Sequence, residues 1–510
     1  MSSWSEGYTT DVQYTSHFHS ELSPTHIAFT ANVTGYRAPD VTKPFAYCEL
    51  GSGQGVSLNL IAAGHPDSRF WGFDFNPGQT ANARRLAEQA GLTNVVFEDW
   101  SFAQAIENAS ALPKFDFITL HGIYSWVSED NRREIVAFID RTLKPGGLVY
   151  ISYNALPGWA GTAPFRHLAR QHLLRFPGRS DRQVPKFLEL SDMLENAGAA
   201  YYATNPSLAS RLKMIRSQPP AYFAHEFLNE NWQPFYVDEV ARQMSGARLE
   251  YMASATLPEN IDVAAVPPGL PALIGQVAPD DRVWQELLRD YANNKAFRRD
   301  IYGRGVNTVT SSEQLNRFLQ WSFALAVPRD EVRLKFNSPL GEIGGAPEIY
   351  NPIFDRLAKG AAGFDELLQL DPGIDRGRLT QALTLLVHSR QVSVLSAKPD
   401  PKAVRPINTA IVEAAYDGVS LGVLVASAAR TGFAVTGNDL FAAGAMLAGR
   451  GKSAEDAAEY VYEKLSARGR AIQKEAKPLT SRKDATAYLV TQFTTALLSK
   501  SVIWKTLGIV

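Results

Sequence analysis

Three glycines at alternate positions follow a short apolar segment near the start of the chain. Residues 47–55 read YCELGSGQG, and an apolar helical pattern, 56–62, comes directly after them. Glycine tolerates positive φ and lets a ligand approach the backbone closely, and the first N–H groups of the following helix can bind an anionic group. The spacing therefore predicts a strand, a cofactor-binding turn and a helix; an ordinary glycine-rich turn is the alternative.

The spacing of these glycines also distinguishes between cofactors. The dinucleotide fingerprint G-x-G-x-x-G would need a glycine at position 56, where the chain has Val56. Glu49, Gly51, Gly53 and Gly55 instead form the pattern E-x-G-x-G-x-G, which resembles motif I of the class I S-adenosylmethionine methyltransferases. The resemblance implies that these four residues bind the methionine and ribose parts of S-adenosylmethionine.

A carboxylate ends the next predicted strand, 70–74. Asp74 stands 23 residues after Gly51, close to the roughly 20-residue offset at which an acidic side chain binds ribose hydroxyls. We therefore predict that Asp74 binds the ribose and that Phe75, beside it, contacts the cofactor. A helix that opens near Pro77 completes a strand-helix-strand unit.

Two further predicted strands, 94–98 and 115–120, also end in polar residues. Asp99 and Trp100 follow the first strand, and His121 follows the second. Since the carboxyl ends of parallel strands border the ligand crevice, these side chains are expected to meet there. The methyltransferase resemblance implies that Asp99 meets the adenine amino group, that Trp100 covers the adenine ring, and that His121 contacts the cofactor or the acceptor. Separate surface turns are the alternative.

Four segments carry a more specific resemblance. They read HGIYSW at 121–126, YNALPGW at 153–159, HEFLNENWQPFY at 225–236 and AFRRDIYGRG at 296–305. Together they resemble bacterial proteins that join a class I methyltransferase to a methyltransferase regulatory domain, among them the rickettsial-type protein-lysine methyltransferases. The resemblance implies an α/β fold with a Rossmann-like sheet, S-adenosylmethionine as cofactor, and a protein lysine as methyl acceptor.

The residues predicted to bind or activate the acceptor follow the fourth and fifth strands. They are His121, Tyr124, Trp126, Tyr153 and Asn154, with His225, Glu226 and Trp232 as second candidates. A lysine must be neutral to attack, and because its ordinary pKa is about 10.4, a desolvating aromatic pocket is needed to favour that form. The alternatives are structural: a buried histidine, aromatic core residues, and an ion pair or helix cap at 225–226.

Helical patterns and shifts in composition divide the chain into regions. The predicted regions are an N-terminal lid at 1–45, a cofactor-binding core at 46–160, a helical insertion at 161–222, a regulatory domain at 223–305, a winged-helix-like region at 306–400 and an all-α C-terminal region at 401–510. The resemblance places Tyr14 of the lid over the cofactor, with simple packing of an N-terminal helix as the alternative. The regulatory domain is expected to complete the sheet, with residues 299–302 as an edge strand.

The composition sets limits on partners. A formal net charge of -1 over 510 residues gives no global basic field, and the predicted helix at 376–388 carries few basic residues, so nucleic acid is disfavoured. The single cysteine, Cys48, excludes an internal disulfide, and the metal-binding spacings H-x-x-x-H and H-E-x-x-H do not occur, so no metal is expected. No apolar run approaches the roughly 20 residues of a membrane span, and we expect a cytoplasmic protein.

Three functions remain open at this point. The first is a protein methyltransferase acting on lysine, the second is a small-molecule O- or N-methyltransferase, and the third is a non-catalytic scaffold that binds S-adenosylmethionine. The resemblance also implies a homodimer that forms through the insertion at 161–222.

Overall fold

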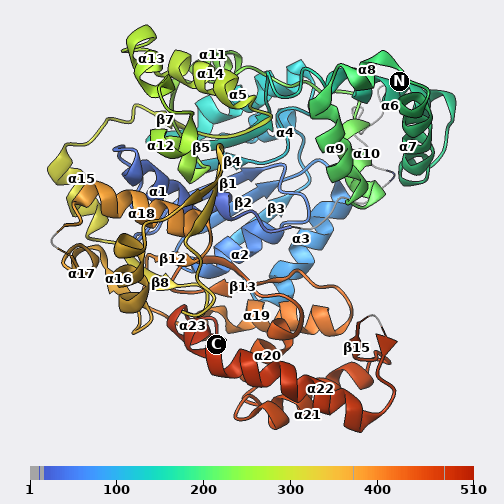
Figure 1. Ribbon diagram of the computed structural model, residues 1–510, viewed down its shortest axis with the longest axis vertical. Coiled ribbons are helices and arrows are strands. Elements are labelled where there is room, and N and C mark those ends of the chain that lie inside the picture. The colour runs from blue at the N-terminus through green and yellow to red at the C-terminus, as the bar shows by residue number, and fades with distance from the viewer. Residues whose placement is uncertain (1–10, 12–16, 372, 476) are drawn as a thin grey trace.

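A seven-stranded sheet runs through the middle of the molecule in the order β3-β2-β1-β4-β5-β7-β6 (Figure 1). The computed structural model describes residues 11, 17–371, 373–475 and 477–510. Tyr14, with the other first residues of the predicted lid, therefore lies outside the described residues. The strands are β1 Ala46–Leu50, β2 Arg69–Phe73, β3 Val95–Glu98, β4 Phe115–Leu120, β5 Leu143–Asn154, β6 Leu249–Ser254 and β7 Phe297–Arg304.

Strands β1 to β5 are parallel, and β7 is antiparallel to both of its neighbours. This arrangement confirms the predicted α/β class and the Rossmann-like sheet. The prediction of an edge strand at 299–302 is wrong, because β7 is an interior strand. Tyr302, for example, pairs with Val149 of β5 on one side and with Tyr251 of β6 on the other. The edge is β6.

The helices that connect the parallel strands begin at capping residues. The side chain of Asn76 accepts a hydrogen bond from the N–H of Gly78 at 3.0 Å, Ser101 forms a capping box, and Ser128 caps the next helix. These caps fix the points at which the chain turns after each strand. The helices are α2 Val56–Gly64, α3 Pro77–Gln89, α4 Phe102–Glu107 and α5 Glu129–Thr142, and α1 Pro24–Val33 precedes the sheet.

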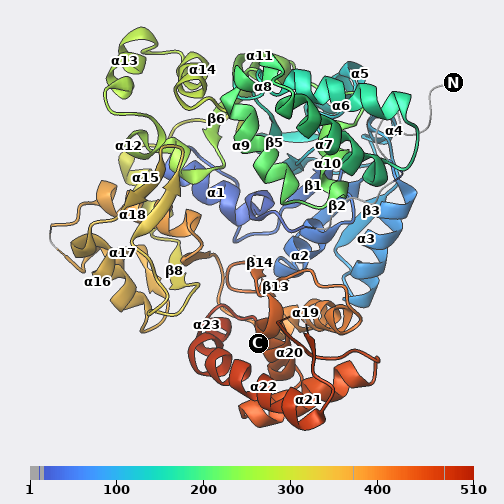
Figure 2. The same cartoon turned by 45° about the vertical axis from the view of Figure 1, so that its right-hand side comes forward.

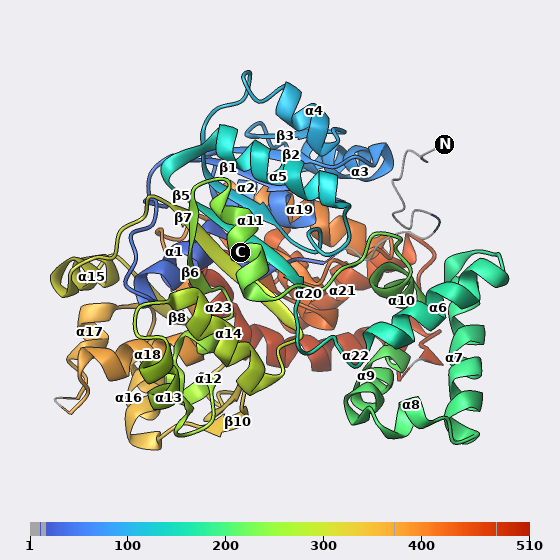
Figure 3. The same cartoon turned by 90° about the horizontal axis from the view of Figure 1, so that it is seen from above.

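A helical insertion separates β5 from β6, as predicted. Its helices are α6 Ala163–Arg175, α7 Ser180–Asn196, α8 Ala200–Ala203, α9 Pro206–Arg216 and α10 Pro220–Phe227. They share a hydrophobic core of their own, which includes Phe165, Phe187 and Phe223, and they stand to one side of the sheet (Figures 1 and 3). The chain returns to the sheet through α11 Val237–Ser245, and the helices α12 Asp262–Ala265, α13 Leu270–Val277 and α14 Arg282–Asn293 lie between β6 and β7.

The middle region contains a small sheet in the order β11-β8-β12. The predicted helix at 376–388 is present, together with helices at 347–357 and 364–368 and a strand at 392–395. The central strand, β8, precedes all three of these helices in the chain. The winged-helix-like description stays a prediction. The elements are α15 Ser311–Phe318, β8 Ser322–Leu325, β9 Lys335–Ser338, β10 Gly341–Gly344, α16 Pro347–Leu357, β11 Ala362–Gly363, α17 Phe364–Leu368, α18 Arg376–His388 and β12 Val392–Leu395.

The C-terminal region packs against α2 (Figures 2 and 3). Val56, Leu60 and Ala63 belong to its hydrophobic core, while Leu58 and Ile61 on the other side of α2 belong to the core under the sheet. The predicted helices are present, together with strands that an all-α description omits. The elements are α19 Pro401–Tyr416, β13 Val423–Ala426, β14 Thr431–Ala434, α20 Gly437–Leu447, α21 Ala454–Ser466, β15 Gln473–Lys474, β16 Lys477–Pro478, α22 Arg482–Thr495 and α23 Ser501–Thr506.

Within the ranges that the structure describes, no helix combines the length and the apolar composition that crossing a membrane requires.

Candidate active site

The glycine turn between β1 and α2 has the geometry that its sequence predicts. Gly51, Gly53 and Gly55 have φ values of 69°, 53° and 66°, in the region that favours glycine. The N–H of Gly51 donates a hydrogen bond to the carbonyl oxygen of Phe73 at 2.7 Å, which ties the turn to the end of β2. A Cβ at Gly51 would collide with the side chain of Ile123, so this glycine also makes room for the loop after β4.

Asp74 braces the same turn from the end of β2. Its Oδ2 accepts a hydrogen bond from the N–H of Gly53 at 2.8 Å, and its Oδ1 accepts one from the N–H of Asn76 at 3.0 Å. Burial raises the pKa of the Asp74 carboxyl to about 6, although both N–H donors act in the opposite direction. The carboxylate is thus oriented by the backbone before any ligand binds.

Glu49 is a second buried carboxyl of the site. It is 5% exposed, and its Oε2 atom has no hydrogen-bond partner among the described residues. Burial, and then the nearby charge of Asp74, raises the pKa of Glu49 to about 8. Because an unpartnered buried carboxyl is costly, we expect a cationic or hydrogen-bond-donating group to satisfy it in the liganded protein.

Two adjoining cavities open at the carboxyl ends of β1, β2 and β4. Both are lined by Gly51, Asp74, Gln79, Gly122 and Ile123. Because they share these residues, a ligand that extends from one cavity into the other would pass directly over Asp74. We call them the aromatic cavity and the histidine cavity, after the side chains that distinguish them.

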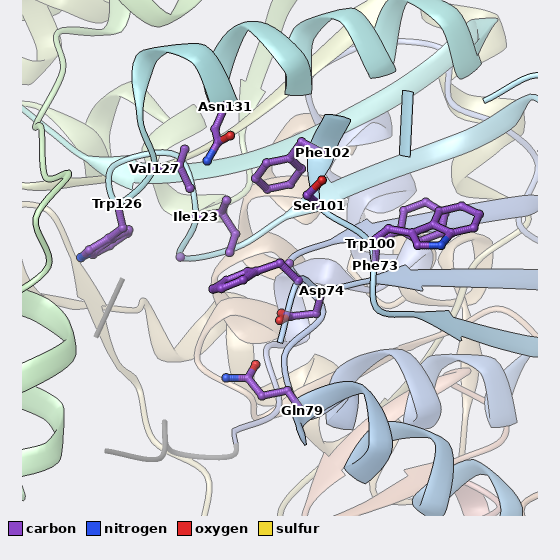
Figure 4. A pocket seen from close by; sticks show the side chains of 13 residues that line it. Phe73, Asp74, Gln79, Trp100, Ser101, Phe102, Ile123, Trp126, Val127 and Asn131 are labelled. Carbon is purple, nitrogen blue, oxygen red and sulfur yellow. The ribbon is translucent and has the colours of Figure 1, made fainter. Parts of the chain in front are cut away.

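The aromatic cavity is shown in Figure 4. Its further lining residues are Phe73, Phe75, Trp100, Ser101, Phe102, Trp126, Val127 and Asn131. The Trp100 indole stacks on Phe73, with ring centroids 5.1 Å apart and an interplanar angle of 21°. Asn131 reaches toward the cavity from α5 and adds an amide to the otherwise apolar wall. Such a lining suits a planar heteroaromatic ring.

Asp99, the residue expected to meet adenine, does not line either cavity. Its side chain is 48% exposed, and its Oδ1 lies 3.9 Å from the guanidinium of Arg84. Trp100, the next residue, is the one that turns inward. Asp99 and Trp100 were both expected at the adenine ring, but only the Trp100 side chain lines the aromatic cavity.

The histidine cavity is the more polar of the two. Its lining includes His17, His19 and His121 together with Glu49, Ser52 and Ser57. The ring of His121 lies against that of His19, with centroids 3.9 Å apart, and its Nδ1 is 2.8 Å from the hydroxyl oxygen of Tyr150.

Both imidazoles are held neutral. Burial, then the neighbouring His19 and Arg299, lowers the pKa of His121 well below its usual value of 6.5, and burial lowers the pKa of His19 to about 4. Glu21 lies close by and stays ionised: burial acts to raise its pKa, but Arg299, His26 and a backbone hydrogen bond together outweigh burial and lower the pKa of Glu21 to about 2. The cavity thus offers neutral proton acceptors at ordinary pH.

Three of the residues predicted to bind the acceptor do not line either cavity. The Tyr124 hydroxyl donates to the Oε1 of Gln243 on α11, and the Tyr153 hydroxyl donates to the Oδ2 of Asp300 on β7 at 2.6 Å. Both tyrosines are fully buried in a hydrophobic core on the opposite face of the sheet from the core that contains Leu58 and Ile61. Asn154 is 2% exposed, and its Nδ2 has no hydrogen-bond partner in the described part of the chain. Trp126, by contrast, lines the aromatic cavity.

The second candidates lie in and beside the helical insertion. His225 and Glu226 belong to α10, and the Trp232 ring lies 5.0 Å from Trp159, between that residue and the guanidinium of Arg166. Burial raises the pKa of Glu226 to about 7, with Arg211 acting in the opposite direction. None of these three residues lines a cavity described above, and both their role at the acceptor site and the ion pair or helix cap at 225–226 stay predictions.

Several lining residues were not predicted from the sequence. Among them are His17, His19, Gln79, Ile123 and Asn131. Gln79 had a usable signal, because it lies in the first turn of the helix that follows Asp74, and that turn faces the ligand crevice. His17 and His19, in the N-terminal lid, had no such signal, because no periodic pattern relates residues 17–19 to the strand ends.

The residues present fit S-adenosylmethionine. Asp74 can accept hydrogen bonds from ribose hydroxyls, and the aromatic cavity beside it suits adenine. The unpartnered Oε2 of Glu49, in the histidine cavity, suits the ammonium group of the methionine part. The two cavities and the carboxyl between them thus match the three parts of one elongated cofactor.

The described side chains were also expected to hold no metal ion. Over the ranges that the structure covers, His, Cys, Asp and Glu side chains form no group of three that could hold a metal ion.

Two protein-family profiles match the chain. One is described as a methyltransferase domain and matches residues 48–149; the other is described as a predicted methyltransferase regulatory domain and matches residues 219–304. The first match contains the glycine turn, Asp74 and His121, and the second contains α11, β6 and β7.

Known proteins resemble the chain over nearly its whole length. An uncharacterized protein of Synechocystis sp. is 36% identical over 497 residues, which cover 95% of this chain and 96% of that protein. An uncharacterized protein of Rickettsia prowazekii is 29% identical over 315 residues, 60% of this chain and 55% of its own length. PKMT2 from Rickettsia typhi, solved in complex with AdoHcy, has the same fold, with a TM-score of 0.70 and 17% identity over 97% of this chain and 99% of that chain.

Proposed function

Because the chain belongs to the family of S-adenosylmethionine-dependent methyltransferases that carry a methyltransferase regulatory domain, we propose that it methylates lysine side chains of proteins. The observation that carries this proposal is the neutral His121 in the histidine cavity, beside the groups that suit the methionine part of the cofactor. The likeness in fold to PKMT2 and the motif resemblance to the rickettsial-type protein-lysine methyltransferases support the same acceptor.

A lysine acceptor creates a specific need for a proton acceptor. Its ammonium group must lose a proton before the nitrogen can attack, and free lysine has a pKa of about 10.4. With a proton on Nδ1, His121 donates to the Tyr150 hydroxyl and leaves Nε2 able to accept the lysine proton. Tyr150 therefore orients the imidazole. Burial keeps Nε2 of His121 free of a proton before the lysine binds, but it also disfavours the imidazolium that the transfer creates, and the negative charge of Glu21 offsets part of this cost.

The remaining residues position the reactants. Bound S-adenosylmethionine supplies an electrophilic methyl group. Asp74 and Glu49 hold the ribose and the ammonium end, and correct alignment of this kind is worth about 7 to 11 kcal/mol in a transfer between bound groups. Burial of the histidine cavity favours a neutral over a charged lysine, which adds to the effect of His121.

We also propose that the protein works as a homodimer in the cytoplasm. The insertion exposes large apolar side chains at the end of α6 and on α7: Leu174 is 64% exposed, Phe176 56% and Met193 69%. Apolar groups of this size on one module suit contact with a second copy. Light scattering should then give about twice the 56.0 kDa of one chain, and replacing all three by serine should return the mass to that of a monomer.

The acceptor is tested by transfer of labelled methyl groups. Purified protein is incubated with methyl-labelled S-adenosylmethionine and cell extract, and protein, nucleic acid and small molecules are separated. The expected result is label in protein, assigned to lysine by mass spectrometry. Asp74→Ala serves as the control that must remove the label, because it removes the ribose ligand.

Other distributions of the label would contradict the proposal. Label confined to the small-molecule fraction would identify a small-molecule methyltransferase, and label in RNA or DNA would identify a nucleic-acid enzyme. Tight binding of the cofactor with no transfer to any fraction would identify a scaffold.

A further inference from the structure

A third cavity lies away from the candidate active site, between the regulatory domain and the middle region. It has a volume of about 660 Å³, within the range of roughly 300 to 1,000 Å³ that is usual for small-molecule sites. The end of α1, the start of α12, and α14, α15 and α18 line it (Figures 1 and 3). We call it the interdomain cavity.

Three arginines and two carboxylates face the interdomain cavity. Arg289 is matched by both acids: it lies 2.7 Å from Asp262 and 3.7 Å from Glu286. Glu286 is bound further by Arg298 at 2.9 Å and by the Tyr251 hydroxyl at 3.0 Å. Both carboxylates of this cavity therefore form ion pairs with arginines of the protein.

The other two arginines have no such partners. Arg282 on α14 donates to the Tyr36 hydroxyl at 2.9 Å, and Arg376 on α18 donates to the carbonyl oxygen of Ser311 at 3.0 Å. Neither lies within 4.0 Å of a carboxylate in the part of the chain that the structure describes. Both keep guanidinium N–H groups in excess of these single bonds, and a guanidinium matches phosphate and carboxylate groups well.

The rest of the lining is uncharged and mixes polar side chains with the apolar Val33, Ile261, Val263 and Phe318. Gln381 and Thr380 of α18, Asn260, and Thr34 at the end of α1 contribute amide and hydroxyl groups. Arg376, Gly377, Thr380 and Gln381 lie along one face of α18, so the side of this 13-residue helix lines the cavity, while the Asp375 carboxylate caps its N-terminus. The hydroxyls of Thr380 and Thr34 and the amide of Asn260 already donate to backbone carbonyl oxygens. The two guanidinium groups therefore supply the spare donors that a polar anion would satisfy and a hydrophobic ligand would not.

We propose that the interdomain cavity binds a small polar molecule bearing a phosphate or carboxylate group, held between Arg282 and Arg376. The two arginines belong to different parts of the chain, one to the regulatory domain and one to the middle region, so the ligand joins these two parts. This site is additional to the proposed methyl transfer and does not depend on the identity of the methyl acceptor.

The end of α1 connects the interdomain cavity to the active site. Thr34 lines the cavity, and the other end of the ten-residue helix follows Glu21 and His19, which lie at the histidine cavity. A helix of this length spans about 15 Å. Occupation of the cavity is therefore positioned to affect the leader residues that pack on His121.

The test uses the full chain saturated with AdoHcy, so that anions do not compete at the cofactor turn. Binding of inorganic phosphate and, separately, of succinate is measured by titration calorimetry at constant ionic strength. We expect saturable binding of at least one probe at millimolar concentration or below. Phosphate binding alone would assign a phosphorylated ligand, and succinate binding alone a carboxylate.

Variants locate the bound anion. Arg376→Gln should weaken binding by about tenfold or more, because it removes a charge-assisted contact and leaves a half-buried side chain of similar size. Arg378→Gln is the matched control, since it lies on the same helix, is paired with Asp375 at 3.9 Å and does not line the cavity. Arg282→Gln should reproduce the loss.

Two results would overturn the inference. One is the absence of saturable binding of either probe at millimolar concentrations. The other is equal binding by the wild type and Arg376→Gln, which would place the anion elsewhere. Neither measurement involves methyl transfer, so failure here leaves the proposed lysine methylation intact, and failure of that proposal leaves this site intact.

Discussion

The two halves of the sheet's carboxyl edge differ in how they build their part of the site. On the cofactor half, at β1 and β2, the backbone itself decides the geometry: three glycines adopt positive φ, and Asp74 is held by two N–H groups of the chain. On the acceptor half, at β4 and β5, contacts with side chains from distant segments determine the geometry. Local motifs therefore locate the cofactor better than the acceptor.

The acceptor half depends on segments far away in the sequence. Tyr153 is turned toward Asp300 of β7, 147 residues later, and Tyr124 toward Gln243 of α11, 119 residues later. His121 is covered by His19, which precedes the sheet. Which of these aromatic residues faces the ligand is thus settled only when the regulatory domain and the leader have packed.

Loss of Asp74 is expected to have the largest effect on the cofactor half. At pH 8, Asp74→Ala should weaken the binding of AdoHcy by about 10²- to 10⁴-fold, since two hydrogen bonds to a charged carboxylate are each worth about 1.5 to 3 kcal/mol. Titration calorimetry measures this directly. Binding within a few-fold of wild type would remove Asp74 from the cofactor site.

Loss of His121 should affect the acceptor half alone. We expect His121→Gln to lower kcat by at least about 100-fold, the usual minimum for a general base, with AdoHcy binding nearly unchanged. Tyr124→Phe is the matched control from the same loop and should keep its kcat, because its hydroxyl serves the core. A normal kcat in the histidine variant would show that another group accepts the proton.

Tyr153→Phe should reduce stability and spare catalysis. It removes a buried hydrogen bond to the Asp300 carboxylate, so the free energy of unfolding should fall by about 1.5 to 3 kcal/mol in a denaturant titration. The activity per folded molecule should be unchanged. A selective loss of kcat with normal stability would return Tyr153 to the acceptor site and weaken the contrast between the two halves.

The pH dependence of cofactor binding should follow the ionisation of Glu49 and Asp74, the two buried carboxyls of the site. Glu49 has a pKa of about 8 and Asp74 of about 6, and the cationic cofactor favours their ionised forms. Affinity should therefore rise with pH, with Asp74 contributing below about 6 and Glu49 below about 8, and level off above 8. Each group can contribute up to about tenfold per pH unit. Glu49→Gln should flatten the upper part of this profile; an unchanged profile would exclude Glu49 as its source.

The same pKa shift has the opposite effect on the stability of the protein without cofactor. The unfolded chain releases the Glu49 proton near its ordinary pKa of 4.5, whereas the folded protein keeps it until about 8. The free energy of unfolding should therefore fall as the pH rises between these values, and saturating cofactor should reduce that fall. Denaturant titrations across this range measure both.

Replacing Asp99 should have the smallest effect. Its side chain is half exposed and lies beside Arg84, outside the aromatic cavity, so Asp99→Ala should change AdoHcy affinity by less than about threefold. A large loss would mean that Asp99 turns inward when adenine binds, as the family resemblance implies.

Much of the fold could be predicted because its signals are local. Capping residues, the glycine turn and apolar strands set the parallel core, and Asn76 and Ser128 mark helix starts where the structure has them. The position of β7 could not be predicted in this way, since a strand of eight residues does not indicate whether it has one neighbour or two. His19 was missed for the same reason, because only packing brings the leader to His121.

The burial of α2 on all sides has a consequence for the modular character of this protein. All nine of its residues are buried, and its outer aliphatic side chains complete the core of the C-terminal region. A catalytic unit cut free of that region would present those side chains to water at the helix that follows the cofactor turn. This methyltransferase core is therefore not a portable domain, and truncated versions are expected to aggregate before their chemistry can be assessed.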